Sequence, residues 1–137
     1  MDWNGQESRK KKRFGVRGST VKYKRKSVFS MLRAPSARFL VLNMSDGGLH
    51  FVTREPLMPG QVLSLDICAP DTDGQINAQG RVIWVRKSQD VEAYHIGVEF
   101  TKMSDKNTSL LRHVLDGALL EKVDMSTKVY LKEIEKL

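Results

Sequence analysis

Six short segments that alternate apolar with polar residues, or are rich in apolar residues, constrain the fold of this 137-residue chain most strongly. They are TVKYK (20–24), ARFLVLNM (37–44), GLHFVT (48–53), VLSLDI (62–67), INAQGRVIWVRK (76–87) and AYHIGVEF (93–100). A period of two is typical of strands with one buried face, and the clusters SDGG, EPLMPG and APDTDG between them are typical of turns. Gly47 and Gly48 of SDGG are able to take positive φ there. Short strands joined by turns predict a small antiparallel barrel.

The periodicity changes after residue 103. Ser104 and Asp105 suit the N-cap of a helix. Apolar residues then recur every three or four positions: Leu110, Leu111, Val114, Leu115, Ala118 and Leu119. This spacing predicts an amphipathic helix over about 104–120 whose apolar face covers the barrel. A weaker pattern in 121–137 predicts a C-terminal extension that is also helical.

The net charge of +7 is concentrated near the N-terminus. Residues 1–38 carry twelve Lys and Arg against two acids, whereas residues 39–137 carry eleven against fourteen. Five consecutive basic residues occupy positions 9–13. Such a run is either a tail that is solubilising or binds nucleic acid nonspecifically, or a surface for an anionic ligand, and charge alone favours the tail.

Catalytic and metal-binding arrangements are hard to assemble from this sequence. His50, His95 and His113 are scattered over two predicted strands and a helix, without neighbours at metal-ligand spacing. Cys68 is the only cysteine, which excludes an intramolecular disulfide and suggests a small core residue. We therefore expect a binding protein without a metal or other cofactor, and not an enzyme. No run of 18 apolar residues occurs, so we expect a cytoplasmic protein without membrane insertion.

Two short motifs follow one another in the first half of the chain. Arg9 and Arg13 form R-x-x-x-R, and Asn43, Ser45 and Gly48 form N-x-S-x-x-G within NMSDGG. With the blocks RFGV, GGLHF, VLSLDI, GRVIWVRK and YHIGVEF in the same order, these motifs resemble the PilZ domain family. The resemblance implies an all-β fold with a C-terminal helix, namely a small six-stranded antiparallel barrel capped by an α-helix.

The resemblance also divides the chain into segments. A flexible tail (1–8) precedes a PilZ domain (9–120) that consists of an arm (9–17), a barrel (about 18–103) and a helix (about 104–120), and an extension (121–137) follows. In this family the arm closes on the bacterial second messenger cyclic di-GMP. We therefore expect the arm to be mobile without the nucleotide and to become ordered on it.

The resemblance implies that Arg9, Arg13, Asn43, Ser45 and Gly48 bind cyclic di-GMP. It further implies an unidentified protein partner that receives the signal and controls motility, adhesion or exopolysaccharide output, and no specific nucleic acid is expected. Side-chain chemistry agrees, because a guanidinium can bind a phosphate or a guanine edge as a fork. An Asn carbonyl can accept from guanine N1 and N2, a Ser hydroxyl can donate to an oxygen, and a glycine permits close approach.

Several alternatives stay open. The N-x-S-x-x-G residues also make a good turn for local reasons. Arg13 and Arg17 form a second R-x-x-x-R, although RFGV follows Arg13 as it does in the family. Trp84 belongs either to the core or a strand face, or it stacks on a guanine. The alternative function is a PilZ-like protein-interaction or nonspecific polyanion-binding module that does not bind cyclic di-GMP.

Overall fold

The computed structural model describes residues 14–15, 18–26, 36–70 and 74–117, which form seven strands and one helix. The strands are β1 (Phe14–Gly15), β2 (Thr20–Arg25), β3 (Phe39–Ser45), β4 (Gly48–Thr53), β5 (Val62–Cys68), β6 (Gln75–Lys87) and β7 (Tyr94–Lys102). The helix is α2 (Asp105–Gly117). Strands β2 to β7 correspond to the six segments that the sequence pattern predicts.

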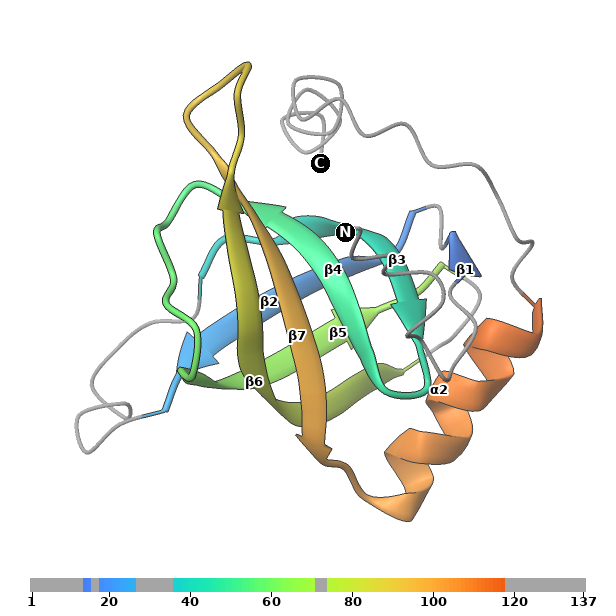
Figure 1. Ribbon diagram of the computed structural model, residues 1–137. Coiled ribbons are helices and arrows are strands. Elements are labelled where there is room, and N and C mark those ends of the chain that lie inside the picture. Colours follow the sequence, from blue (N-terminus) through green and yellow to red (C-terminus); the bar gives the residue numbers. More distant parts are fainter. Residues whose placement is uncertain (1–13, 16–17, 27–35, 71–73, 118–137) are drawn as a thin grey trace, which may run out of the picture.

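Strands β2 to β7 close into an antiparallel barrel (Figure 1). The order around the barrel is β3-β2-β5-β6-β7-β4, and β4 pairs with β3 to complete the ring. Two strands share the remaining edge of β3, because β2 pairs with its first residues and β1 pairs with Asn43 and Met44. The predicted six-stranded antiparallel barrel with a C-terminal helix is confirmed.

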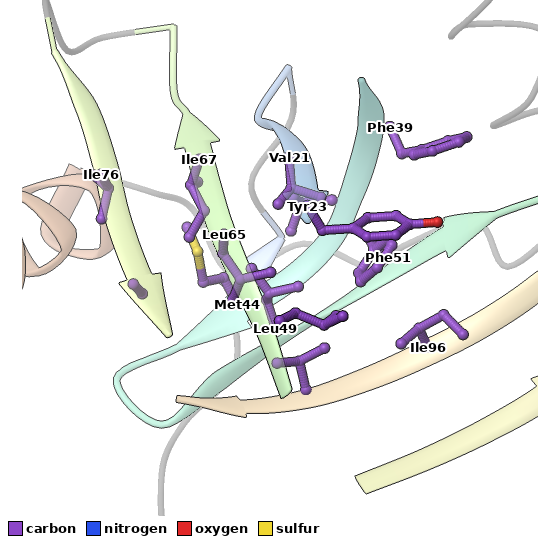
Figure 2. Close-up of a cluster of buried hydrophobic side chains, with 14 of the residues drawn as sticks. Val21, Tyr23, Phe39, Met44, Leu49, Phe51, Leu65, Ile67, Ile76 and Ile96 are labelled. Carbon is purple, nitrogen blue, oxygen red and sulfur yellow. The ribbon is translucent and has the colours of Figure 1, made fainter. Parts of the chain in front are cut away.

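The inward-facing side chains form the apolar core of the barrel (Figure 2). In β5, Leu63, Leu65 and Ile67 are buried while the residues between them are more exposed, as a strand with one buried face requires. Phe51 of β4 is fully buried, and its ring centroid lies 5.5 Å from that of Tyr23 on β2. Contacts of this kind join strands that are distant in sequence, so the core holds the ring closed.

Helix α2 lies at one end of the barrel (Figure 1). Ser104 caps it, since its Oγ accepts the backbone N–H of Asn107 at 3.2 Å. Leu111 and Leu115 lie four residues apart on one helix face and are buried in the core. The predicted N-cap and barrel-facing stripe are therefore confirmed. The predicted tail (1–8), residues 118–120 and the extension (121–137) lie outside the described residues.

The turn between β3 and β4 consists of Asp46 and Gly47. Neither Gly47 nor Gly48 has a positive φ, so the turn does not use the conformational freedom that the sequence offered. Gly48 is needed for space, because a Cβ there would lie 2.0 Å from the carbonyl oxygen of Val98 on β7. The close approach of two backbones therefore selects glycine at this position. Within the described residues, α2 is too short and too polar to cross a membrane.

Candidate functional site

The N-x-S-x-x-G residues lie where β3 passes into β4. A β-bulge interrupts the β3–β4 ladder between Val41 and Asn43. Val41 and Met44 belong to the core, whereas Leu42 packs in a separate cluster with Val52 and Ala93. Because the bulge adds one residue, the next side chain of β3 that points into the core after Val41 is that of Met44. Asn43 and Ser45, on either side of Met44, therefore face outward.

Asn43 is joined to two histidines on the outer face of the barrel. Its Nδ2 lies 3.3 Å from Nδ1 of His50 on β4, and Nε2 of His50 lies 2.9 Å from Nδ1 of His95 on β7. Both rings are buried. His50 pairs with Gly97 and His95 with Val52, so the two histidines are diagonal neighbours on adjacent strands. Sequence spacing made the histidines look scattered, but strand pairing brings two of them together.

Trp84 of β6 completes this cluster. Its ring meets the His50 ring edge to face, with centroids 5.0 Å apart and planes at 65°. A Cβ on Gly97 would lie 2.1 Å from Trp84 Nε1, so the absence of a side chain at Gly97 makes room for the indole. The guanidinium of Arg86 lies 5.6 Å from the centroid of the Trp84 ring. Trp84 is thus a strand-face residue and not part of the barrel core.

The environment of His95 favours a neutral imidazole. Burial lowers the pKa of His95, and the positive charge of Arg86 lowers it further, while Asp90 partly opposes both effects. A neutral imidazole has one N–H donor and one nitrogen acceptor. The hydrogen bond between His50 and His95 therefore has a direction, and so does the contact between His50 and Asn43.

Ser45 and Gly48 take part in the turn itself. Ser45 is buried, and its Oγ accepts the backbone N–H of Gly47 at 3.1 Å. The local interpretation as a turn former is therefore correct for Ser45, whereas Gly48 is selected by its close approach to β7. It does not exclude a ligand, because a hydroxyl that accepts one hydrogen bond can still donate its own hydrogen.

The short strand β1 connects this region to the basic run. Gly15 pairs with Asn43 and Phe14 with Met44. Phe14 directly follows Arg13 in the sequence. The predicted ligand residues Arg9 and Arg13 themselves lie outside the described residues, as does Arg17 of the rival motif. The structure thus brings Asn43, Ser45 and Gly48 together and leaves the two arginines untested.

Sequence reasoning missed the group formed by His50, His95 and Trp84. A signal was present, since His50 alternates with the inward Phe51, and His95 with the inward Ile96, so both point outward. The missing information was that β4 and β7 are neighbours. Within the described ranges, no group of three or more His, Cys, Asp or Glu side chains is placed to hold a metal ion.

Comparison with known proteins identifies the family. The family profile of the PilZ domain matches residues 7–117. The chain therefore belongs to the PilZ domain family. A comparison with curated proteins finds no significant match.

Several solved structures share the fold. YcgR from Escherichia coli, solved in complex with c-di-GMP, has a TM-score of 0.61 and 12% identity, over 95% of this chain and 51% of YcgR. The MrkH–c-di-GMP complex of K. pneumonia has a TM-score of 0.58 and 20% identity, over 79% of this chain and 50% of MrkH. The inhibitor of motility MotI/DgrA of Bacillus subtilis has a TM-score of 0.58 and 18% identity, over 79% and 50%. The chain spans about half the length of these proteins.

Proposed function

We propose that this chain is a receptor for cyclic di-GMP that binds the nucleotide through Arg9, Arg13, Asn43, Ser45 and Gly48. It acts by binding and without catalysis or a further cofactor. Membership of the PilZ domain family supports this proposal, as do YcgR and MrkH, structural relatives that were solved with c-di-GMP. The described residues add an independent argument from chain geometry.

The pairing of β1 with β3 carries the proposal. Because Gly15 lies opposite Asn43, the chain leaves the basic run beside the N-x-S-x-x-G motif. Phe14 is paired with Met44, and Arg13 directly precedes Phe14 in the chain. Because consecutive Cα atoms are about 3.8 Å apart, the Cα of Arg13 lies about that far from the Cα of Phe14. The Cα of Arg9 is within about 18 Å of that of Phe14 by chain length alone. Two motifs that are thirty residues apart in sequence can therefore reach one ligand.

The outward groups suit a nucleotide with two guanines and two phosphates. The Asn43 amide can accept from guanine N–H groups, and the Ser45 hydroxyl can donate to an oxygen. Ser45 is buried, so the nucleotide would have to uncover it. Arginine forks would supply the charge-assisted contacts to phosphate or guanine.

The output is a further part of the proposal. We infer that the nucleotide-bound arm acts on a protein partner, with motility, adhesion or exopolysaccharide production as the result. The shared fold of MotI/DgrA, described as an inhibitor of motility, is in keeping with such an output. Because the chain spans only half of its structural relatives, the partner must be identified by experiment.

Isothermal titration with cyclic di-GMP, GMP and single-stranded DNA in one buffer tests the binding. We expect saturable binding of cyclic di-GMP only. Arg13→Ala should weaken it by about 2 kcal/mol or more, and Arg13→Lys should restore part of the loss, since an ammonium cannot form the fork. Arg81→Ala, on an exposed residue of β6, is the matched control. Equal responses to all three ligands would instead identify a nonspecific polyanion-binding module.

Limited trypsin digestion tests the role of the arm. Cleavage within 9–17 should be slowed several-fold by saturating cyclic di-GMP, because contacts to the nucleotide offset the cost of ordering each residue, about 1–2 kcal/mol. An equal concentration of GMP has one guanine and cannot bridge the arm to Asn43 in the same way. Equal protection by both nucleotides would contradict a closing arm.

A further inference from the structure

The hydrogen-bonded side chains of Asn43, His50 and His95 link the orientation of the Asn43 amide to the protonation of two histidines. The amide of Asn43 is flat, with a donor end and an acceptor end, and its Nδ2 faces Nδ1 of His50 at 3.3 Å. Its carbonyl end therefore points away from His50. Which end faces His50 is decided by whether His50 Nδ1 carries a proton, and that in turn depends on His95, 2.9 Å away.

The protons of the neutral pair can be counted. One proton lies in the hydrogen bond between His50 Nε2 and His95 Nδ1. If His50 supplies it, His50 Nδ1 is a bare acceptor, and Asn43 donates to it through Nδ2. The second proton of the pair is then on Nε2 of His95. In this arrangement the Asn43 carbonyl faces outward, where it can accept from guanine.

A third proton on the pair forces a different arrangement. The bond between His50 and His95 still holds one proton, because two would collide across 2.9 Å. The other two protons must then occupy His50 Nδ1 and His95 Nε2, whichever ring formally bears the charge. His50 Nδ1 becomes a donor. Asn43 can keep its hydrogen bond to His50 only by turning its amide, which moves the carbonyl inward and the NH₂ outward.

We propose that the His50–His95 pair positions the Asn43 amide, and that uptake of one proton by the pair converts the outward group of Asn43 from an acceptor to a donor and weakens guanine binding. The inference rests on the proposed function, because it concerns affinity for cyclic di-GMP. His50 and His95 are positioning residues in it and do not touch the nucleotide.

The surroundings of the pair agree with this mechanism. Gly97 leaves room for Trp84, whose ring packs against His50 and limits its rotation. Among the described residues, Arg86 of β6 and Asp90 of the β6–β7 loop act on His95 with opposite signs. Burial and Arg86 together lower the pKa of His95, which favours its neutral ring, and the contact of Asn43 Nδ2 with His50 Nδ1 then selects the acceptor-outward form.

Nitrogen NMR of the free protein tests the arrangement without any ligand. At about pH 7.5 the His50 Nδ1 should have the shift of an unprotonated nitrogen, with the proton of His50 on Nε2. As the pH falls, a proton should appear on His50 Nδ1, and the side-chain amide signals of Asn43 should change with the same midpoint. A proton on His50 Nδ1 at neutral pH would overturn the proposal even if cyclic di-GMP binds.

Titration with cyclic di-GMP from about pH 7.5 to 5 tests the consequence for binding. Affinity should stay constant down to the lowered pKa of the pair and should then fall, with a slope that approaches tenfold per pH unit. The nucleotide itself does not titrate in this range. Binding that is present but independent of pH would overturn the inference, whereas no binding at any pH would overturn the proposed function.

Asn43→Asp tests whether the pH dependence of binding arises from the orientation of the Asn43 amide. A carboxylate has acceptors at both ends, so protonation of the pair cannot remove the outward acceptor. The pH-dependent loss of affinity should therefore disappear in this variant. His113→Asn, on an exposed histidine of α2, is the control and should keep the wild-type pH profile. A profile unchanged by Asn43→Asp would show that the titration acts elsewhere.

Discussion

The two faces of strand β4 are similarly buried but chemically different. Leu49 and Phe51 face the core, whereas His50 and Val52 face outward, and all four are at most 5% exposed. The inner side chains belong to the main hydrophobic cluster of the barrel. On the outer side, Val52 packs with Leu42 and Ala93, while His50 is hydrogen-bonded to His95.

This difference separates burial that stabilises the fold through apolar contact from burial that fixes the direction of polar groups. An apolar core is held by surface removed from water and tolerates other apolar side chains of similar volume. Buried polar side chains that are hydrogen-bonded to one another need partners at defined positions, since an unpaired buried polar group lowers the stability by about 1–3 kcal/mol. The outer face of β4 therefore carries directional information that the inner face lacks.

Phe51→Ala should give the largest change in stability. Phe51 is fully buried, and its removal leaves a cavity beside Tyr23, so the free energy of unfolding should fall by about 3–5 kcal/mol. Chemical denaturation monitored by circular dichroism measures this. A loss below about 1 kcal/mol would contradict a closely packed inner face.

Gly97→Ala should disturb the outer face alone. A Cβ would lie 2.1 Å from Trp84 Nε1, so the indole must move away from His50. We expect a loss of about 1–3 kcal/mol, with changed tryptophan fluorescence and changed imidazole signals of His50. Gly74→Ala is the control, because nothing lies within 4 Å of its Cβ position. Unaltered fluorescence in Gly97→Ala would refute the packing of Trp84 on Gly97.

The free energy of unfolding should decrease as the pH is lowered, because of His95. Its pKa is lower in the folded protein than the value of about 6.5 in the unfolded chain, so below that value the unfolded chain binds a proton that the folded chain does not. The free energy of unfolding should be constant above about pH 6.5. It should then fall by at most about 1.4 kcal/mol per pH unit until the folded-state pKa is reached.

His95→Asn sharpens this measurement, because its Oδ1 can replace the Nδ1 acceptor without titrating. Between about pH 7.5 and 5.5 its stability should change less with pH than that of the wild type. His113→Asn should keep the wild-type slope. Equal slopes in all three proteins would place the titrating group elsewhere.

Arg112→Ala should have the smallest effect. Its guanidinium lies 3.9 Å from Asp46, and both side chains are largely exposed, so solvent screens the pair. We expect a change below about 0.5 kcal/mol, measured by thermal unfolding. A larger loss would mean that α2 is held to the β3–β4 turn by more than packing.

The strands and the helix were predictable because they depend on local periodicity. In VLSLDI, Leu63 and Leu65 alternate with Ser64, and this pattern alone marks the buried face. Leu111 and Leu115 mark the helix face in the same way. The N-x-S-x-x-G motif was predictable as a turn and as a family signature, although the role of its residues in binding stays a prediction.

Strand neighbours were decided only by the tertiary structure. His50 and His95 are 45 residues apart and meet because β4 pairs with β7 to close the ring. The period of two could have placed each histidine on the outward side of its own strand, but it could not show that they meet, since one period-two pattern fits several pairings. Likewise, Gly48 looked like a turn glycine, and only the position of Val98 on β7 showed that it makes room for another backbone. Local pattern determines which way a residue faces, while closure of the barrel determines what it faces.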